Sequence, residues 1–227
     1  MADIAVIDYG MGNIRSVAKA IEHVAPGKSV VVSDDPDEIG RAKRVVFPGQ
    51  GAMPDCMREL DARGLRKAVL DAAERKPFLG LCIGLQMHFE QSEEGDVEGL
   101  ALLPGRVLRF PAERMFDDRH ARLKVPHMGW NEVYQTTAHP LWAGIEDGSR
   151  FYFVHSYYVE SGDQTLVAGF SRYPFAFTCA VARNNIFAVQ FHPEKSQTAG
   201  LQLLSNFVGW DGVFRPGAVH ARGAVSA

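Results

Sequence analysis

The sequence has few cysteines, little net charge and no long apolar run. The 227 residues include 3 cysteines at scattered positions, an odd number that argues against a disulfide framework and favours a reducing compartment. The 24 basic and 27 acidic side chains leave a net charge of −3, without the basic footprint of a nucleic-acid-binding protein. No run approaches the length of a membrane span, and residues 1–10 lack the basic region of a signal peptide. We therefore expect a cytoplasmic protein without nucleic-acid or membrane partners.

Short apolar runs alternate with helical patterns through the first half of the chain. This rhythm predicts an α/β fold with a mostly parallel, doubly wound central sheet flanked by helices. The second half predicts short antiparallel strands added at one side of that sheet. The expected strands are 4–7, 29–33, 44–47, 78–81, 106–110, 132–134, 151–155, 157–159, 166–169, 175–181 and 185–190.

The length of the chain and the lack of a linker favour a single domain over residues 1–214. Residues 111–125 carry charges of both signs and are expected to form an exposed excursion. Residues 215–227 are rich in small residues and have no periodicity, so we expect a flexible tail.

The stretch 77–90, PFLGLCIGLQMHFE, places Cys82 between an apolar strand and a helical pattern. Gly80 and Gly84 flank it as G-x-C-x-G, a nucleophile elbow with cysteine in the serine position. Glycines allow the strand and helix to approach closely around a strained turn. A helix N-terminus also favours the thiolate. The alternative is a buried core cysteine, because free cysteine is among the most buried residue types.

His192 and Glu194, in the sequence FHPE, directly follow another buried strand. The carboxyl ends of parallel strands share one edge of a sheet, so these side chains are expected to meet Cys82 there. A cysteine nucleophile needs an imidazole base and a carboxylate to orient it, which predicts a Cys82–His192–Glu194 triad. A surface turn is one alternative. A metal site is another, but no further His or Cys lies at ligand spacing, so no metal is expected.

A loop rich in Gly and Pro, residues 48–54, also follows a buried strand. Such a loop adopts unusual dihedral angles and can point amide N–H groups at a developing negative charge. A plain turn is an equally good interpretation from this stretch alone.

Taken together, G-L-C-I-G-L-Q and F-H-P-E make the chain resemble the class I (triad) glutamine amidotransferases. Within that class it is similar to the glutaminase subunits of imidazole glycerol phosphate synthase, in histidine biosynthesis. The resemblance covers nearly the whole chain up to about Phe214. A departure is Gln50, where the family often has an apolar residue. The motifs that carry the finer resemblance are PGQG at 48–51, DYGMGN at 8–13, HMGWN at 127–131, FVHSY at 153–157 and HPEKSQ at 192–197.

The resemblance implies that Cys82 attacks the carboxamide of glutamine, with His192 as base and Glu194 as its partner. The oxyanion would be held by the N–H of Ile83 and by one from Gly49, Gln50 or Gly51. Ammonia leaves, water hydrolyses the thioester to glutamate, and no cofactor is needed.

The resemblance also implies contacts beyond the triad. Gln86, one helical turn after Cys82, would bind the glutamine substrate, and Glu90 is a further candidate on the same face. A (β/α)8 cyclase subunit would form a heterodimer with this chain and use the ammonia to make imidazole glycerol phosphate and AICAR from PRFAR. The positions that match the family's partner and ammonia passage are Asn13, Trp130, Tyr152 and Lys195.

Other functions stay open at this point. The chain could be the amidotransferase subunit of another pathway, such as anthranilate, aminodeoxychorismate or GMP synthesis. It could be a free-standing γ-glutamyl hydrolase, which would work steadily without a partner. A non-catalytic binding subunit of the same fold is the alternative from a different class, and the complete triad argues against it.

Overall fold

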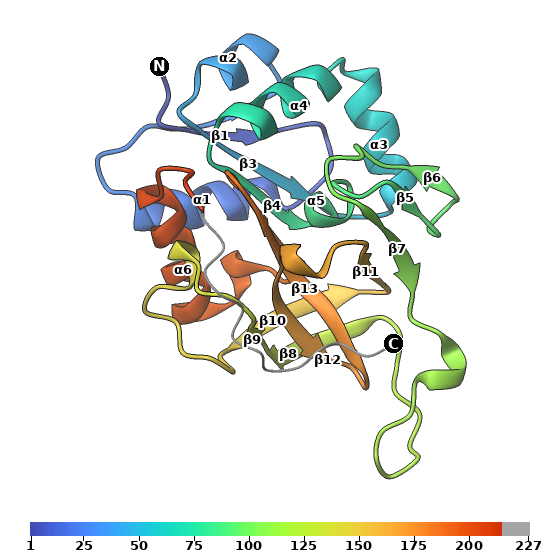
Figure 1. Ribbon diagram of the computed structural model, residues 1–227. Helices are drawn as coiled ribbons and strands as arrows, with labels where there is room; N and C mark the ends of the chain where they lie inside the picture. Colours follow the sequence, from blue (N-terminus) through green and yellow to red (C-terminus); the bar gives the residue numbers. More distant parts are fainter. Residues whose placement is uncertain (215–227) are drawn as a thin grey trace.

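The structure is a computed structural model that describes residues 1–214. The tail expected over residues 215–227 therefore lies outside the described residues. The main feature is a 12-stranded sheet with the order β2-β1-β3-β4-β14-β13-β11-β7-β5-β6, to which β12 and β9 are attached beside β13. Helices cover both faces of the sheet (Figure 1), as the sequence predicted.

The half of the sheet that carries the functional residues is parallel, from β2 through β14. Because β1 lies between β2 and β3, the direction of winding reverses beside β1. In such sheets ligands bind outside the carboxyl ends of the strands near this reversal. The strands of this half are β1 (Ile4–Ile7), β2 (Val30–Ser33), β3 (Arg44–Gly49), β4 (Phe78–Cys82) and β14 (Ile186–Val189).

The helices form two layers because each presents an apolar stripe to the sheet. In α1, Ile14, Val17 and Ile21 recur at helical spacing and are buried. That helix packs in one core cluster with the buried face of α6, while residues of α2, α3 and α4 belong to the cluster on the other side. The helices are α1 (Ile14–Val24), α2 (Pro36–Arg41), α3 (Met53–Ala62), α4 (Arg66–Arg75), α5 (Ile83–Gln86) and α6 (Gln197–Gly209).

The remaining strands add a mostly antiparallel region to the sheet beyond β14, in which β5 alone pairs in parallel, with β7. They are β5 (Gln91–Ser92), β6 (Val97–Glu98), β7 (Gly105–Arg109), β9 (Tyr134–Gln135), β11 (Tyr157–Ser161), β12 (Val167–Arg172) and β13 (Ala176–Arg183). A separate two-stranded ribbon pairs β8 (His127–Glu132) with β10 (Arg150–His155) in antiparallel register. Four short 3₁₀ turns complete the described elements: η1 (Ala112–Arg114), η2 (Pro140–Trp142), η3 (Gln164–Leu166) and η4 (Pro193–Lys195).

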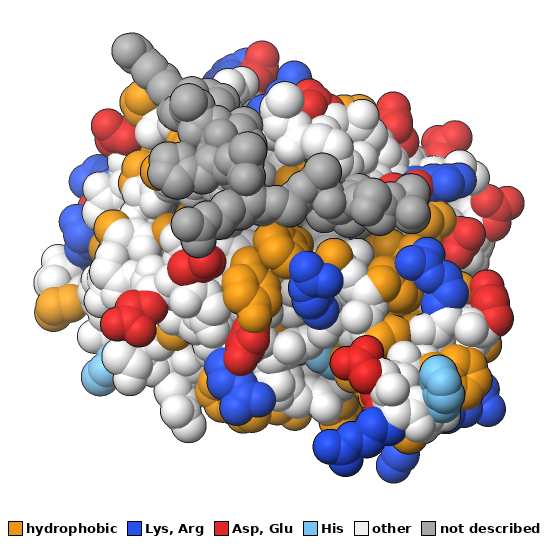
Figure 2. All heavy atoms as spheres, turned by 60° about the horizontal axis from the view of Figure 1, so that its bottom comes forward, with side chains coloured by type: hydrophobic (Ala, Val, Ile, Leu, Met, Phe, Trp, Pro, Cys, Tyr) orange, Lys and Arg blue, Asp and Glu red, His pale blue; other side chains and the backbone are white. Residues whose placement is uncertain are grey.

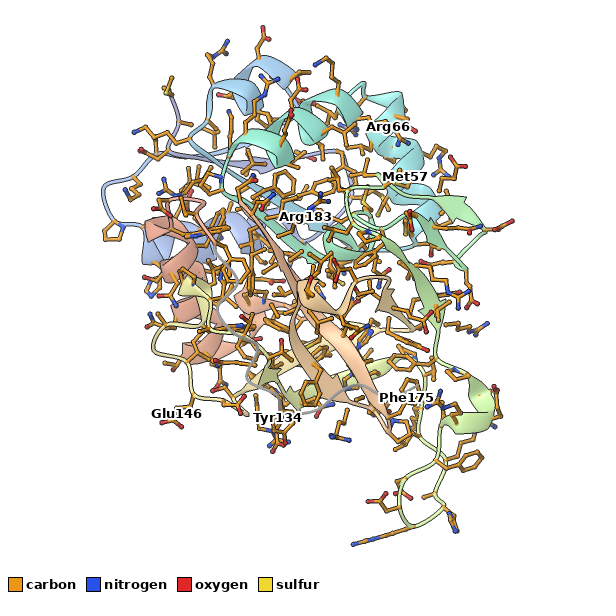
Figure 3. The ribbon with its side chains drawn as sticks, in the orientation of Figure 1. Met57, Arg66, Tyr134, Glu146, Phe175 and Arg183 are labelled. Carbon is orange, nitrogen blue, oxygen red and sulfur yellow. The ribbon has the colours of Figure 1, made fainter. Side chains whose placement is uncertain are left out.

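Residues 111–125 form the expected exposed excursion, which extends away from the sheet below β7 (Figure 1). Two contacts attach it to the turn between β12 and β13. The guanidinium of Arg114 lies over the ring of Phe175, 4.2 Å from its centre, and the hydroxyl of Tyr173 donates to the carbonyl of Lys124 at 2.8 Å. Figure 3 labels Phe175 at this end of the molecule, far from Arg66 and Met57 on the helices at the opposite end.

Two sequence predictions about local structure were wrong. The helix after Cys82 ends at Gln86, so its spacing does not continue to Glu90. The chain instead continues in tight turns, with i→i−3 bonds from His88 and Phe89. The segment expected as one strand, 132–134, is divided between β8 and β9.

The surface carries interspersed acidic, basic and apolar side chains on the face shown in Figure 2. No helix within residues 1–214 is long and apolar enough to cross a membrane.

Buried histidines are unusually frequent in the core. His88, His127, His139 and His155 are each at most 5% exposed. Burial lowers the pKa of His88 and His127 to about 4, and that of His139 and His155 to about 3. These imidazoles are therefore neutral in the folded protein near neutral pH.

This burial predicts an acid-sensitive fold. His139 has a pKa of about 3 when folded and 6.5 when exposed, so between these values only the unfolded chain binds its proton. Its contribution to stability is present above pH 6.5 and is lost as the pH falls. From about pH 7.5 to about pH 5, this one residue should cost about 2 kcal/mol of unfolding free energy.

Urea unfolding of the wild type and of His139→Asn at both pH values measures this cost. Asn keeps an acceptor for the N–H of Leu141, which His139 Nδ1 accepts at 3.0 Å, but it cannot titrate. The variant should lose less stability on acidification, whatever its absolute stability. Equal losses in the two proteins would contradict the assignment.

Candidate active site

The turn at Cys82 has the strained geometry of a nucleophile elbow. Cys82 has φ 55° and ψ −111°; it is the last residue of β4, and α5 begins at the next residue. A Cβ on Gly84 would lie 2.1 Å from the carbonyl oxygen of Phe47, and a Cβ on Gly80 would lie 2.9 Å from Ala188. Glycine is therefore required on both sides of the cysteine, because β3, β4 and α5 approach too closely for a larger residue.

The structure brings Cys82, His192 and Glu194 to the same edge of the sheet. The Nδ1 of His192 lies 3.0 Å from Oε1 of Glu194, whose side chain is only 1% exposed. An Nδ1–H that donates to this carboxylate leaves Nε2 available to the thiol of Cys82. Burial lowers the pKa of His192, but the charge of Cys82 and the hydrogen bonds with Cys82 and Glu194 outweigh it and raise the pKa above its ordinary value. The arrangement suits a thiolate–imidazolium pair.

Cys82 and His192 open into a cavity of about 340 Å³, large enough for an amino-acid side chain and backbone. Cys82 is 4% exposed and His192 5% exposed, so the reacting groups lie at the base of a hollow rather than on an open surface. The lining residues are Gln50, Gly51, Cys82, Ile83, Gln86, Glu94, Pro126, Val154, His155, Ser156, Tyr157, His192 and Lys195.

The expected oxyanion donors lie on two adjacent backbone segments. A Cβ on Gly49 would be 2.7 Å from Cβ of Ile83 and 2.8 Å from the N of Gly84, so the end of β3 lies against the start of α5. Ile83 is the first residue of α5, where an N–H has no intrahelical partner. Gly51 has φ +105°, a conformation that glycine adopts readily. Beneath this loop, the buried hydroxyl of Tyr9 donates to the carbonyl of Pro48 at 2.9 Å.

A hydrogen-bonded pair of glutamines lies behind the cysteine. The side-chain N–H of Gln86 donates to Oε1 of Gln190 at 3.0 Å, and that of Gln190 points to the sulfur of Cys82 at 3.7 Å. Oε1 of Gln86 is buried without a protein partner among the described residues. A buried unpaired acceptor at the cavity wall is available for a substrate N–H.

Glu90 does not line the cavity, contrary to its predicted place beside Gln86. Because α5 ends at Gln86, the helical spacing that would align Glu90 with it does not continue. Its carboxylate is exposed and instead accepts the N–H of Gly105 at 2.8 Å. The carboxylate at the cavity is that of Glu94, which also accepts the N–H of Met53 at the start of α3 at 2.8 Å.

The residues expected to face a partner lie in different settings. Trp130 and Tyr152 are cross-strand neighbours on the β8–β10 ribbon, with ring centres 5.9 Å apart, and Trp130 is 40% exposed. Lys195 lines the cavity mouth. Asn13 is half-buried before α1, in a loop that reaches the oxyanion segment: Gly12 lies beside Gly49 and Met11 beside Gly51.

Sequence reasoning missed two buried polar residues that support the triad. Gln190 follows an apolar strand, where a fully buried glutamine signals a specific partner. Ser196 donates to the carbonyl of His192 at 2.6 Å and accepts the N–H of Tyr152 at 3.0 Å. The N–H of His192 in turn donates to the carbonyl of Tyr152 at 2.9 Å. The turn that carries His192 is thus fastened to β10.

No group of three or more His, Cys, Asp or Glu side chains positioned to hold a metal ion occurs among the described residues. The chemistry that this arrangement supports is acyl transfer through the cysteine, since nucleophile, base and backbone donors line one cavity and a buried carboxylate orients the base from behind.

Comparison with known proteins agrees with this chemistry and makes it more specific. Residues 5–209 match the model of the glutamine amidotransferase class-I family. The imidazole glycerol phosphate synthase subunit HisH of Thiobacillus denitrificans is 69% identical over 92% of both chains. The protein of the same description from Aromatoleum aromaticum is 67% identical over 92% of this chain and 99% of its own.

Solved structures agree on the fold. A structure described as a glutamine amidotransferase superimposes with a TM-score of 0.68 at 14% identity, and covers 92% of this chain and 100% of its own. A putative GMP synthase subunit from Thermoplasma acidophilum superimposes with a TM-score of 0.65 at 19% identity, over 92% of this chain and 93% of its own. The chain therefore belongs to the class-I glutamine amidotransferase family and, within it, to the HisH subunits of imidazole glycerol phosphate synthase.

Proposed function

We propose that this chain, as the glutaminase subunit of imidazole glycerol phosphate synthase, hydrolyses glutamine through a thioester on Cys82 and passes ammonia to a (β/α)8 cyclase subunit. The observation that carries the proposal is that Cys82 and His192 line one cavity beside a glycine loop, with Glu194 bonded to His192 from behind. The high identity to HisH subunits supports the pathway over anthranilate, aminodeoxychorismate or GMP synthesis.

In the first half-reaction the sulfur of Cys82 attacks the δ-carbon of glutamine. The N–H of Ile83, together with one from Gly49, Gln50 or Gly51, stabilises the oxyanion. Removal of one such donor commonly costs about 10²–10³ in rate. The protonated His192 then gives its proton to the leaving nitrogen, the C–N bond breaks, and ammonia and a γ-glutamyl thioester result.

In the second half-reaction neutral His192 takes a proton from water as the water attacks the thioester. Collapse of the second tetrahedral intermediate breaks the C–S bond and releases glutamate and the thiolate of Cys82. Glu194 holds the imidazole in one tautomer throughout and stabilises its charged form, without taking the proton itself.

Glutamine recognition is assigned to Gln86 and Glu94. Glutamine carries an α-ammonium group, and Glu94 is the one carboxylate among the residues that line the cavity. The buried acceptor Oε1 of Gln86 suits a second N–H of the same ammonium group. Glu90 is not assigned this role, because it does not line the cavity.

The cyclase partner is assigned to the face that carries Trp130 and Tyr152, with Lys195 and Asn13 near the cavity mouth. An exposed tryptophan, with Met128 61% exposed on the same strand face, fits an aromatic interface core. The proposal also includes that residues 1–214 form one domain and that the protein works in the cytoplasm. The three free, buried cysteines suit such a reducing compartment.

The role of Cys82 predicts complete loss of glutaminase activity in Cys82→Ala, because Cys82 is the one thiol among the residues that line the cavity. The measurement is glutamate release from glutamine by the chain mixed with a cyclase subunit and its ribonucleotide ligand. Cys179→Ala is the matched control, since Cys179 is fully buried in the core cluster that does not contain Cys82. Glutamate release that survives in Cys82→Ala would disprove the thioester mechanism.

The role of Glu94 predicts a binding defect. Glu94→Gln should raise the KM for glutamine about tenfold with a smaller change in kcat, because a neutral amide no longer balances the ammonium charge. The amide oxygen still accepts the N–H of Met53, so α3 is preserved. Glu90→Gln is the matched control and should leave KM unchanged. A KM defect in Glu90→Gln alone would reverse the assignment.

A further inference from the structure

A second histidine, His155, lines the cavity but takes no part in the proposed chemistry. Its Nδ1 lies 2.7 Å from the carbonyl oxygen of Tyr157, and its Nε2 lies 2.9 Å from Nδ1 of His127. Nε2 of His127 lies 3.3 Å from the side-chain nitrogen of Asn131, which also donates to the carbonyl of Arg172 at 2.8 Å. A continuous line of hydrogen bonds therefore runs from β8 to the cavity wall.

The direction of every bond in this line is determined by its ends. A carbonyl only accepts, so Nδ1 of His155 carries the hydrogen and its Nε2 is an acceptor. His127 must then donate from Nδ1, which leaves its Nε2 to accept from Asn131. Both imidazoles are neutral, with all ring nitrogens engaged. His155 therefore cannot exchange protons with substrate, although it faces the cavity.

The line ends on an oxygen that substrate recognition also uses. The carbonyl of Tyr157 accepts the Nδ1–H of His155 and, at 3.3 Å, the side-chain N–H of Gln86. The side-chain N–H groups of Gln86 thus point to Tyr157 and Gln190. Its Oε1 points away from both residues and is left as a buried acceptor. A shift of the Tyr157 carbonyl would release Gln86.

His127 lies outside the cavity lining and is packed between aromatic rings. Its ring stacks on Tyr173 with centres 4.0 Å apart, and on Phe153 at 5.0 Å. His127 and His155 are directly paired across the ribbon, on the inward face. Trp130 lies on the same strand but on the outward face, since side chains alternate along a strand.

We propose that His127 is a positioning residue for glutamine: it fixes His155 in one tautomer, His155 holds the Tyr157 carbonyl, and that carbonyl orients Gln86 for the substrate. The inference rests on the proposed use of glutamine. In this proposal a residue of the β8–β10 ribbon affects glutamine binding through His155, Tyr157 and Gln86, without contacting the substrate.

Two substitutions at His127 separate hydrogen bonding from packing. His127→Phe keeps a ring between Tyr173 and Phe153 but has no N–H for His155. His127→Asn loses the ring, yet its side-chain nitrogen falls close to the place of Nδ1 and can still donate. A packing role predicts that Phe is the milder change, whereas a positioning role predicts that Asn is.

The readout is alkylation of Cys82 in the purified chain by two reagents. One is a glutamine analogue in which a chloromethyl group replaces the amide nitrogen. The sulfur displaces chloride as the C–S bond forms. The other is iodoacetamide, which loses iodide in the same way but does not use the amino-acid site. Cys82→Ala gives the background for both reagents, and thermal unfolding of each variant reports packing.

We expect His127→Phe to react about tenfold more slowly with the glutamine analogue and at the wild-type rate with iodoacetamide. His127→Asn should stay within about threefold of the wild type for both reagents, even with a lower Tm. Wild-type rates in His127→Phe, equal losses with both reagents, or a larger loss of analogue labelling in Asn would overturn the proposal. A wild type that shows no preference for the analogue would overturn the glutamine site itself along with it.

Discussion

The close approach of three backbone segments at the carboxyl edge of the sheet is the constraint on which the site depends. β3, β4 and the start of α5 meet where a single methyl group on Gly84 would contact the carbonyl of Phe47 at 2.1 Å. The same contact between segments forces Cys82 to positive φ and places Ile83 beside Gly49. Nucleophile and oxyanion donors are therefore positioned by main-chain packing, which leaves the cysteine side chain free to react.

The parallel half of the sheet and the separate β8–β10 ribbon contribute different parts of the site. The parallel half supplies the nucleophile and the backbone donors. The ribbon holds the base, because the N–H of His192 donates to the carbonyl of Tyr152 on β10, and Ser196 bridges the same two residues. A ribbon that carries an exposed aromatic pair on one face thus holds the triad histidine by its backbone. A partner that docks on that face would directly contact β10, the strand that positions the base.

The fold and the triad were predictable because their signals are local. Apolar runs identify the buried strands, and each candidate residue directly follows one, so the shared edge of a parallel sheet brings Cys82 near His192. The ribbon, the division at Val133 and the short α5 were not predictable, because they depend on long-range pairing. β8 pairs with β10, and the backbone of residues 87–90 bonds to that of residues 99–105. Glu94 was missed for the same reason: it reaches the cavity from a turn between two-residue strands, where no periodicity exists.

The two histidines at the cavity, His155 and His192, differ in the direction in which their surroundings shift their pKa values. Burial lowers the pKa of His155 first, and the nearby His127 and His192 lower it further, so His155 stays neutral beside the base. Burial also lowers the pKa of His192, but the charge of Cys82 and the hydrogen bonds with Cys82 and Glu194 outweigh it. The pKa values of two histidines that face one cavity are thus shifted in opposite directions. Ammonia release requires one protonated imidazole beside the leaving nitrogen, and a second positive imidazole at the same cavity would repel the substrate's ammonium group.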